Sequence, residues 1–183
     1  MIKIAFTFLL FGCLALVAPK LAFGQKANPK TVVARFGGEC EGTKYRFSTR
    51  LKKLIQKYRQ PTNYPCDYEF CDGAFAYDLN GDGRKEYFVR LTCGATGNCT
   101  YGIFSDRSAK LQGKFTAWFF FIHKRTGSWS KISTYTREGG DQGFIESWVY
   151  RRKKYIQVAE RTERLLSSSQ KAFYERMGMP ECP

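Results

Sequence analysis

The chain has 183 residues and carries 30 Lys and Arg against 16 Asp and Glu, which gives a formal net charge of +14. This length fits one domain, and the positive excess predicts either contact with anionic partners or a solvated surface that keeps the protein soluble. A single histidine and the lack of zinc-type cysteine spacing in the sequence argue against a zinc site.

The first 24 residues have the features of a secretory signal peptide. Lys3 supplies the positive start, residues 4–17 form an apolar run, and residues 22–24 (AFG) match the small-x-small pattern of a cleavage site. A membrane anchor is the alternative, but the run is short for a span and Pro19 interrupts its end. We therefore expect an exported protein, periplasmic or secreted, with no transmembrane segment after cleavage.

Cleavage removes one of the seven cysteines, and the even number that remains predicts three disulfides in an exported chain. The candidates are Cys40, Cys66, Cys71, Cys93, Cys99 and Cys182. Short spacings favour Cys66–Cys71 and Cys93–Cys99 as local bridges, which leaves Cys40–Cys182 to tie the two ends together. This pairing is one of about 15 that six cysteines allow.

We divide the chain after the leader into an N-terminal lead-in and loop at 25–47 and a single disulfide-braced domain at 48–183. The lead-in begins with a segment, 25–35, that we expect to be mobile. The domain begins with a predicted helix that Ser48 caps. Its apolar residues repeat at i, i+3, i+4 and i+7 from Leu51 to Tyr58, while basic residues cover the opposite side.

The rest of the domain is predicted to be mostly strands, because apolar and polar residues alternate between turn signals. The predicted strands are 75–79, 87–91, 100–104, 115–124, 129–135, 144–150 and 155–160. The segment 115–124 (FTAWFFFIHK) is so apolar that we expect one strand buried on both faces. A short last helix is predicted over 168–177, before Gly178. The fold class is therefore β-rich α+β, an antiparallel meander of about seven strands with one helix before and one short helix after the sheet.

The clearest chemical motif is the run AYDLNGDGRKEYFV between two of these strands. Oxygen-bearing positions alternate along it and can point to one side of a tight turn; they are Asp78, Asn80, Asp82, Arg84 (through its carbonyl) and Glu86. Gly83 supplies the sharp bend that such a loop needs. Hard oxygen ligands of this kind predict calcium as the metal. The alternative is a metal-free polar turn, since Asn-Gly and Asp-Gly are ordinary turn dipeptides.

The spacing is EF-hand-like, but the twelfth loop position is Val89, which cannot ligate, so a helix-loop-helix hand is not expected. The run resembles the calcium loops of FG-GAP-type and integrin-type repeats. It also resembles exported bacterial proteins in which one such loop precedes a Cys-Gly…Cys segment, here CGATGNC at 93–99. The resemblance covers roughly residues 75–104. It implies side-chain ligation by Asp78, Asn80, Asp82 and Glu86 and a backbone oxygen from Arg84.

These features predict an exported, non-enzymatic protein that binds one structural calcium ion and interacts with anionic envelope components. Two alternatives from other classes remain open. One is a calcium-dependent secreted hydrolase of an anionic polymer, in which Glu86 or Asp82 shares the ion with substrate and His123 or an arginine lies near the scissile group. The other is a basic inhibitor or effector that docks on an acidic protein. No specific nucleic-acid motif is present in the sequence, and the oligomeric state is left open.

Two basic segments have a simpler interpretation. Residues 151–154 (RRKK) fit a charged hairpin turn, although neighbouring tyrosines would also suit contact with phosphates or sulfated sugars. The helix face with Lys52, Lys53 and Lys57 fits a solvated surface. We expect the only histidine, His123, to end a strand without a catalytic role.

Overall fold

The computed structural model describes residues 31–38, 40, 42–59, 73–139, 142–164 and 170–180. The predicted signal peptide and the cysteines Cys66, Cys71 and Cys182 lie outside these ranges. Within them the elements are β1 (Val32–Gly37), α1 (Thr49–Tyr58), β2 (Ala74–Tyr77), β3 (Glu86–Cys93), β4 (Cys99–Ser105), β5 (Lys110–Ala117), β6 (Phe119–His123), β7 (Ile132–Gly139), β8 (Gln142–Arg151), β9 (Lys154–Arg164) and α3 (Gln170–Arg176).

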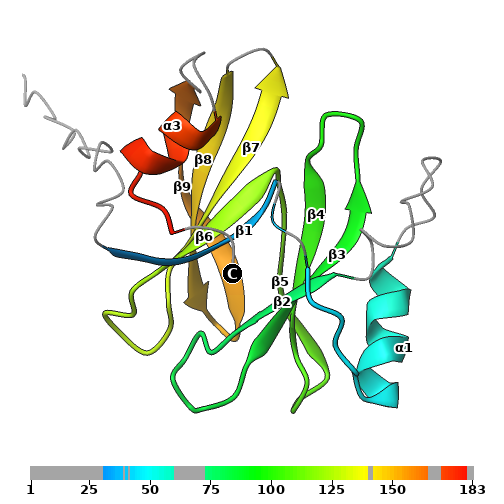
Figure 1. Ribbon diagram of the computed structural model, residues 1–183. Coiled ribbons are helices and arrows are strands. Elements are labelled where there is room, and N and C mark those ends of the chain that lie inside the picture. The colour runs from blue at the N-terminus through cyan, green and yellow to red at the C-terminus, as the bar shows by residue number, and fades with distance from the viewer. Residues whose placement is uncertain are drawn as a thin grey trace, which may run out of the picture.

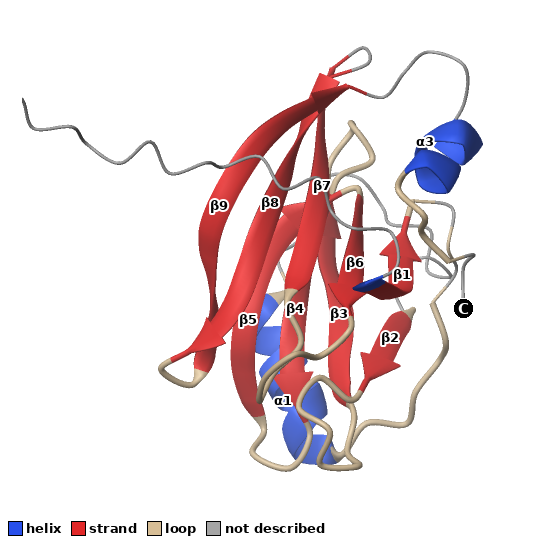
Figure 2. Cartoon of the chain, turned by 90° about the vertical axis from the view of Figure 1, so that its left-hand side faces the viewer, coloured by secondary structure: helices blue, strands red, loops and turns tan. Residues whose placement is uncertain are grey.

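The strands form two antiparallel sheets, which confirms the β-rich α+β fold class (Figure 1). One sheet has the order β1-β6-β7-β8-β9 and the other the order β2-β3-β4-β5. Figure 2 shows α1 and α3 beside different sheets, away from the layer between them. The described part of the chain has nine strands rather than about seven, and they are split between two sheets rather than joined in one meander.

Aromatic side chains fill the space between the two sheets. Phe88 from one sheet stacks on Phe120 from the other with ring centroids 4.6 Å apart, and both are fully buried. Phe36 and Tyr101 pack against the same Phe120 ring. Because large rings from both sheets meet here, this layer is the main source of hydrophobic stabilisation.

Each helix buries its apolar side on the outer face of a sheet. Leu51 and Ile55 of α1 pack with Val89 and Phe104, as the helical spacing predicts. The predicted cap is confirmed, since the Ser48 hydroxyl accepts a hydrogen bond from the N–H of Leu51 at 3.3 Å. These contacts fix α1 on the four-stranded sheet.

The predicted last helix is also confirmed, and α3 covers the outer face of the five-stranded sheet. Its Phe173 and Tyr174 make edge contacts with Phe119, at centroid distances of 5.9 and 5.2 Å. This cover on one face and the aromatic layer on the other bury β6 along its whole length.

Two predicted segments differ in the structure. The lead-in contains β1, which pairs with β6, so it is not mobile throughout. The apolar run 115–124 is not one strand: it breaks at Trp118, where the chain leaves β5 of one sheet and enters β6 of the other. The N–H of Trp118 donates to the carbonyl of Tyr135 at 2.7 Å, which holds the crossover.

The predicted bridge Cys93–Cys99 is confirmed and closes the turn between β3 and β4. Cys40 is also disulfide-bonded and is buried at 2% exposure. Its partner falls outside the described residues, so the predicted pairing with Cys182 stays a prediction. No helix among the described ranges is both long and apolar enough to cross a membrane.

Candidate metal centre

The predicted ligand loop joins β2 to β3, as the flanking strand patterns predict. Tyr77 and Glu86 face each other as the last paired residues of the two strands. Leu79 points inward and is fully buried, and its carbonyl accepts a hydrogen bond from the N–H of Ser130 at 2.7 Å. One apolar side chain and one backbone bond therefore fix the base of the loop against the β6–β7 connection.

Short side chains order the rest of the loop. The carboxylate of Asp78 accepts hydrogen bonds from the N–H groups of Gly81 and Gly83, at 2.6 and 2.9 Å. Asn80 accepts one from the N–H of Asp82, also at 2.9 Å. Such bonds from side chains to nearby backbone groups are how Asp and Asn favour turns over strands.

The two glycines of the motif have positive φ angles, +73° at Gly81 and +81° at Gly83. A residue with a Cβ is strained in this conformation. At Gly81 the space that a Cβ would fill is taken by the guanidinium of Arg125. The glycine spacing of the motif thus reflects backbone geometry and, at one position, the close approach of a side chain.

Glu86 is the buried acid of the loop, with 4% exposure. Its carboxylate accepts a hydrogen bond from the N–H of Leu79 at 3.0 Å. The pKa of Glu86 is raised to about 7, mainly by burial, while the Leu79 bond lowers it and the negative charges of Asp82 and Asp78 add to the rise. A buried carboxyl with two acidic neighbours is a place where a cation would be stabilised.

Asp82 behaves differently because it is exposed. Its Oδ1 accepts a hydrogen bond from the N–H of Arg84 at 2.9 Å. That bond, more than any nearby charge, holds the pKa of Asp82 below its usual value. The loop therefore pairs one ionised carboxylate with one carboxyl, that of Glu86, whose charge is disfavoured.

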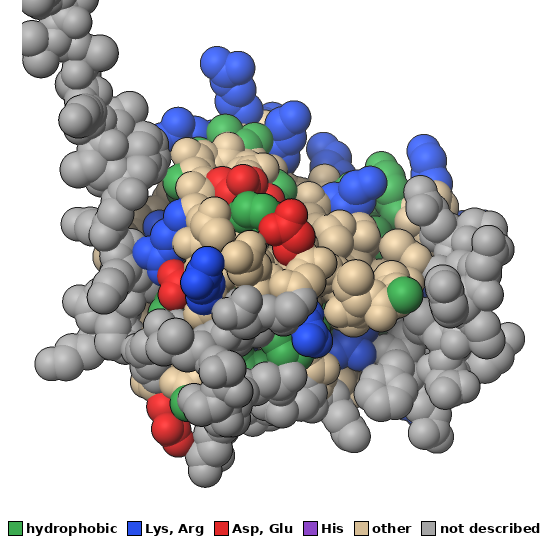
Figure 3. Space-filling view, turned by 90° about the horizontal axis from the view of Figure 1, so that it is seen from above, with side chains coloured by type: hydrophobic (Ala, Val, Ile, Leu, Met, Phe, Trp, Pro, Cys, Tyr) green, Lys and Arg blue, Asp and Glu red, His purple; other side chains and the backbone are tan. Residues whose placement is uncertain are grey.

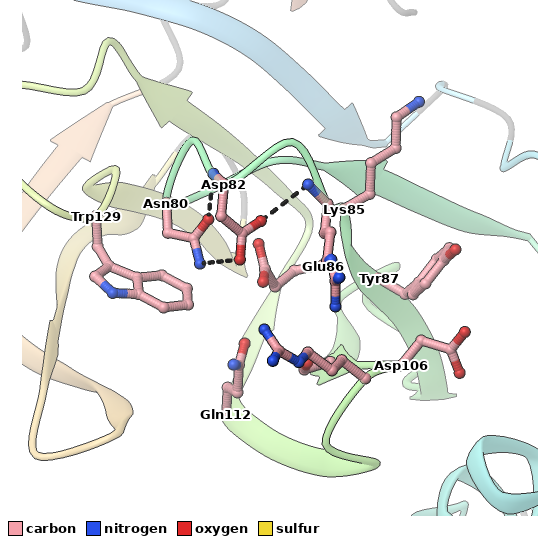
Figure 4. A pocket seen from close by; sticks show the side chains of 11 residues that line it. Asn80, Asp82, Lys85, Glu86, Tyr87, Asp106, Gln112 and Trp129 are labelled. Atoms are coloured by element: carbon pink, nitrogen blue, oxygen red, sulfur yellow. Dashed lines mark hydrogen bonds between the residues drawn. The ribbon is translucent and has the colours of Figure 1, made fainter.

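The loop borders a pocket of about 440 Å³. Asn80, Asp82 and Glu86 line one side of it, and Gln112 and Trp129 line the other (Figure 4). In Figure 4 the oxygen-bearing ends of Asn80, Asp82 and Glu86 point into the same hollow. Four separate segments contribute to this pocket, namely the loop with the start of β3, the β4–β5 turn, β5 and the β6–β7 connection.

The predicted ligands are therefore only partly brought together. Asn80, Asp82 and Glu86 share the pocket, and Arg84 is also among the residues that line it. Asp78 is not, and both of its oxygens accept backbone hydrogen bonds. Across the described ranges, no group of three or more His, Cys, Asp or Glu side chains is arranged to hold a metal ion.

The donor chemistry nevertheless fits calcium. Two carboxylates and an amide oxygen face the pocket, and the same loop carries a third carboxylate, that of Asp78, outside the pocket lining. All are hard oxygen donors, as Ca²⁺ prefers. Three basic residues, Arg84, Lys85 and Arg107, also line the pocket, and of these Lys85 points away from the hollow in Figure 4.

The sequence analysis missed the far side of the pocket. Gln112 comes from β5 and Trp129 from the β6–β7 connection, and Arg107 lies in the β4–β5 turn. Trp129 stacks on Tyr150 with centroids 3.7 Å apart. No local sequence signal marks these residues, because only the packing of the two sheets brings them to the loop.

His123 ends β6 as predicted, but it does not line the pocket. Its Nε2 lies 2.8 Å from the Ser133 hydroxyl, and it is 8% exposed. The hydrolase hypothesis placed His123 or an arginine near a scissile group beside the ion; His123 is not among the residues that line this pocket, whereas Arg84 and Arg107 are. The basic run 151–154 forms the β8–β9 turn, with positive φ at Arg152 and Lys153.

No protein-family model matches the sequence, and comparisons with curated proteins and with solved structures give no match. The FG-GAP-type resemblance therefore depends on the loop residues alone.

Proposed function

We propose that this chain is an exported, non-enzymatic protein whose β2–β3 loop is held by one structural calcium ion. The supporting observation is Glu86, a buried carboxyl that shares a pocket with Asn80 and Asp82. Its charge is disfavoured by burial and by two acidic neighbours. A divalent cation would relieve that repulsion, and the hard oxygen donors favour calcium over softer metals.

The export part of the proposal rests on the leader at 1–24 and on the disulfides. The Cys93–Cys99 bridge and the bonded Cys40 suit an oxidising compartment. Millimolar calcium is typical of such extracellular sites, which bind with dissociation constants on the order of 10⁻⁴–10⁻³ M. The ion would then brace the loop rather than carry a signal.

The test is thermal melting in millimolar calcium, in magnesium and in chelator. Calcium at about ten millimolar should stabilise the parent by roughly 1.5–3 kcal/mol, which raises the melting temperature by about 5 °C. Glu86→Gln and Asp82→Asn should abolish this response, whereas Asp106→Asn, which lines the same pocket outside the ligand register, should keep it. Equal melting of the parent in calcium and chelator would refute the calcium site.

A second candidate function is hydrolysis of an acidic polysaccharide. It is favoured by the pairing of Glu86, whose pKa is about 7, with Asp82, whose pKa is lowered, in a pocket that Trp129 borders. A protonated carboxyl beside an ionised one is the usual acid and base pair of glycoside hydrolases. Turnover of a polyuronate that is lost in Glu86→Gln and kept in Asp106→Asn would support this candidate and overturn the non-enzymatic assignment.

A further inference from the structure

A second hollow lies beside α1, apart from the calcium loop. It has a volume of about 360 Å³ and is bordered by α1 on one side and by the chain that leads into it on the other. Lys52 and Gln56 line the helix side, and Lys44, Tyr45 and Phe47 line the opposite side. Lys52 and Gln56 are four residues apart, so they lie one above the other along the helix.

The segment that forms this groove carries only positive charges. Residues 43–59 contain no Asp or Glu. Their basic side chains are all exposed, and they are Lys44, Arg46, Arg50, Lys52, Lys53, Lys57 and Arg59. Such a concentration of one sign of charge around a hollow attracts polyanions.

Other parts of the surface are mixed. Figure 3, seen from above, shows Lys and Arg side chains scattered over another face with Asp and Glu side chains among them. Near α1 an acidic contact occurs at the N-terminal end, where the Ser48 hydroxyl donates to Asp106 at 2.8 Å. The positive charge that a polyanion needs therefore lies further along the helix, beside the groove.

The groove also has aromatic walls. Tyr45 and Phe47 are partly buried and make edge contacts with Tyr87 of β3, at centroid distances of 5.3 and 5.2 Å. These contacts hold the rings in place before any ligand binds. Fixed rings beside cationic side chains suit sugar rings that carry acidic groups, because the ring packs against the aromatic wall while the charge meets lysine.

We propose that the groove between α1 and residues 44–47 binds an acidic polysaccharide, with Lys44 and Lys52 contacting its carboxylate or sulfate groups. The choice of a polysaccharide rests on the proposed export of the chain, since uronate and sulfate polymers are found outside the cytoplasm. The groove itself is independent of the calcium loop. Gln56 supplies an amide for the sugar hydroxyls on the same side of the helix as Lys52.

The test compares two double variants of equal charge. Lys44→Ala with Lys52→Ala removes two lysines that line the groove, and Lys53→Ala with Lys57→Ala removes two exposed lysines of the same helix that do not. Affinity for an oligo-uronate is measured by calorimetry at two salt concentrations. The groove variant should bind about tenfold more weakly than the parent at low salt, while the control variant stays within about twofold.

If both variants lost uronate affinity equally, the proposed binding in the groove would be wrong, and general electrostatic attraction would explain the binding. Tighter binding of single-stranded DNA or of anionic phospholipid vesicles than of the oligo-uronate, at matched salt, would overturn the polysaccharide assignment. Unchanged melting of both variants shows that neither has lost its fold. Glu86→Gln, which tests calcium, should keep the uronate affinity, so a failure of the calcium proposal and a failure of the groove can be told apart.

Discussion

At the scale of single residues, His123 is the buried group whose protonation most directly opposes folding. Its Nε2 faces the Ser133 hydroxyl, and its Nδ1 lies 3.4 Å from the hydroxyl of Thr31. Burial lowers the pKa of His123 to about 4, and the positive charge of Lys131 adds to this effect. The folded protein therefore holds the neutral imidazole.

The sign of the pH effect follows from this depressed pKa. An unfolded histidine titrates near pH 6.5, so the stability linked to His123 is complete above that pH. It is lost as the pH falls toward about 4, where the folded group also protonates. Between pH 6.5 and about 4, we expect the free energy of unfolding of the parent to fall by up to about 3 kcal/mol relative to that of His123→Gln.

Glu86 changes the stability in the opposite direction over an overlapping pH range. Its raised pKa contributes stability that is present below pH 4.5 and is lost as the pH rises through about 7. The measurement is therefore the difference between the parent and His123→Gln in urea unfolding from pH 7 to pH 4, because both proteins contain Glu86. A difference that does not change with pH would contradict the buried neutral histidine.

At the scale of elements, local periodicity predicted α1 and the strands that flank the calcium-type loop. The face from Leu51 to Tyr58 is apolar at helical spacing, and Tyr87, Val89 and Leu91 alternate with their neighbours. The helix has one solvated side, which is why its period is visible, whereas β3 is buried on both faces from Phe88 to Leu91. The turn at the loop is fixed by its own residues, so its place between two strands could be predicted as well.

The run 115–124 could not be divided from the sequence, because it has no polar side. Phe120 faces the layer between the sheets while Phe119 and Phe121 lie under α3, so every position from Ala117 to His123 is buried. The break at Trp118 depends on its bond to Tyr135 of β7. Gln112 and Trp129 were missed at the candidate site for the same reason, since distant segments bring them to the loop.

The β3–β4 hairpin gives a prediction at this scale. Its disulfide joins Cys93 and Cys99, which are paired across the two strands at a sequence separation of 6. A bridge that closes so short a loop restricts the unfolded chain only modestly. Replacing both cysteines by serine should lower the free energy of unfolding by about 2 kcal/mol and leave the fold unchanged.

Chemical denaturation of the double Cys→Ser variant measures this change, and far-UV circular dichroism tests the fold. Treatment of the parent with a reductant serves as the matched comparison for the other disulfides. If the variant lost its sheet signal altogether, the hairpin would depend on the bridge for its formation, contrary to this expectation.

At the scale of the whole molecule, the two sheets are held together by one aromatic layer. Phe120 of β6 contacts Phe36 of its own sheet and Phe75, Phe88 and Tyr101 of the other. It is fully buried. The pocket at the calcium-type loop also depends on this layer, because Trp129 belongs to one sheet's connections and Glu86 to the other sheet.

Phe120→Ala should therefore destabilise the protein as a unit. Loss of a fully buried ring leaves a cavity between the sheets and costs about 3–5 kcal/mol. Val33→Ala is the control, since Val33 of β1 is 40% exposed and its truncation should cost less than about 0.5 kcal/mol. Trp118 and Trp148 lie on the five-stranded sheet's side of the molecule, whereas the circular dichroism signal reports both sheets. In Phe120→Ala, the unfolding midpoints measured by tryptophan fluorescence and by circular dichroism should therefore shift together. Two separate transitions would show that the sheets fold independently and that Phe120 is not their shared centre.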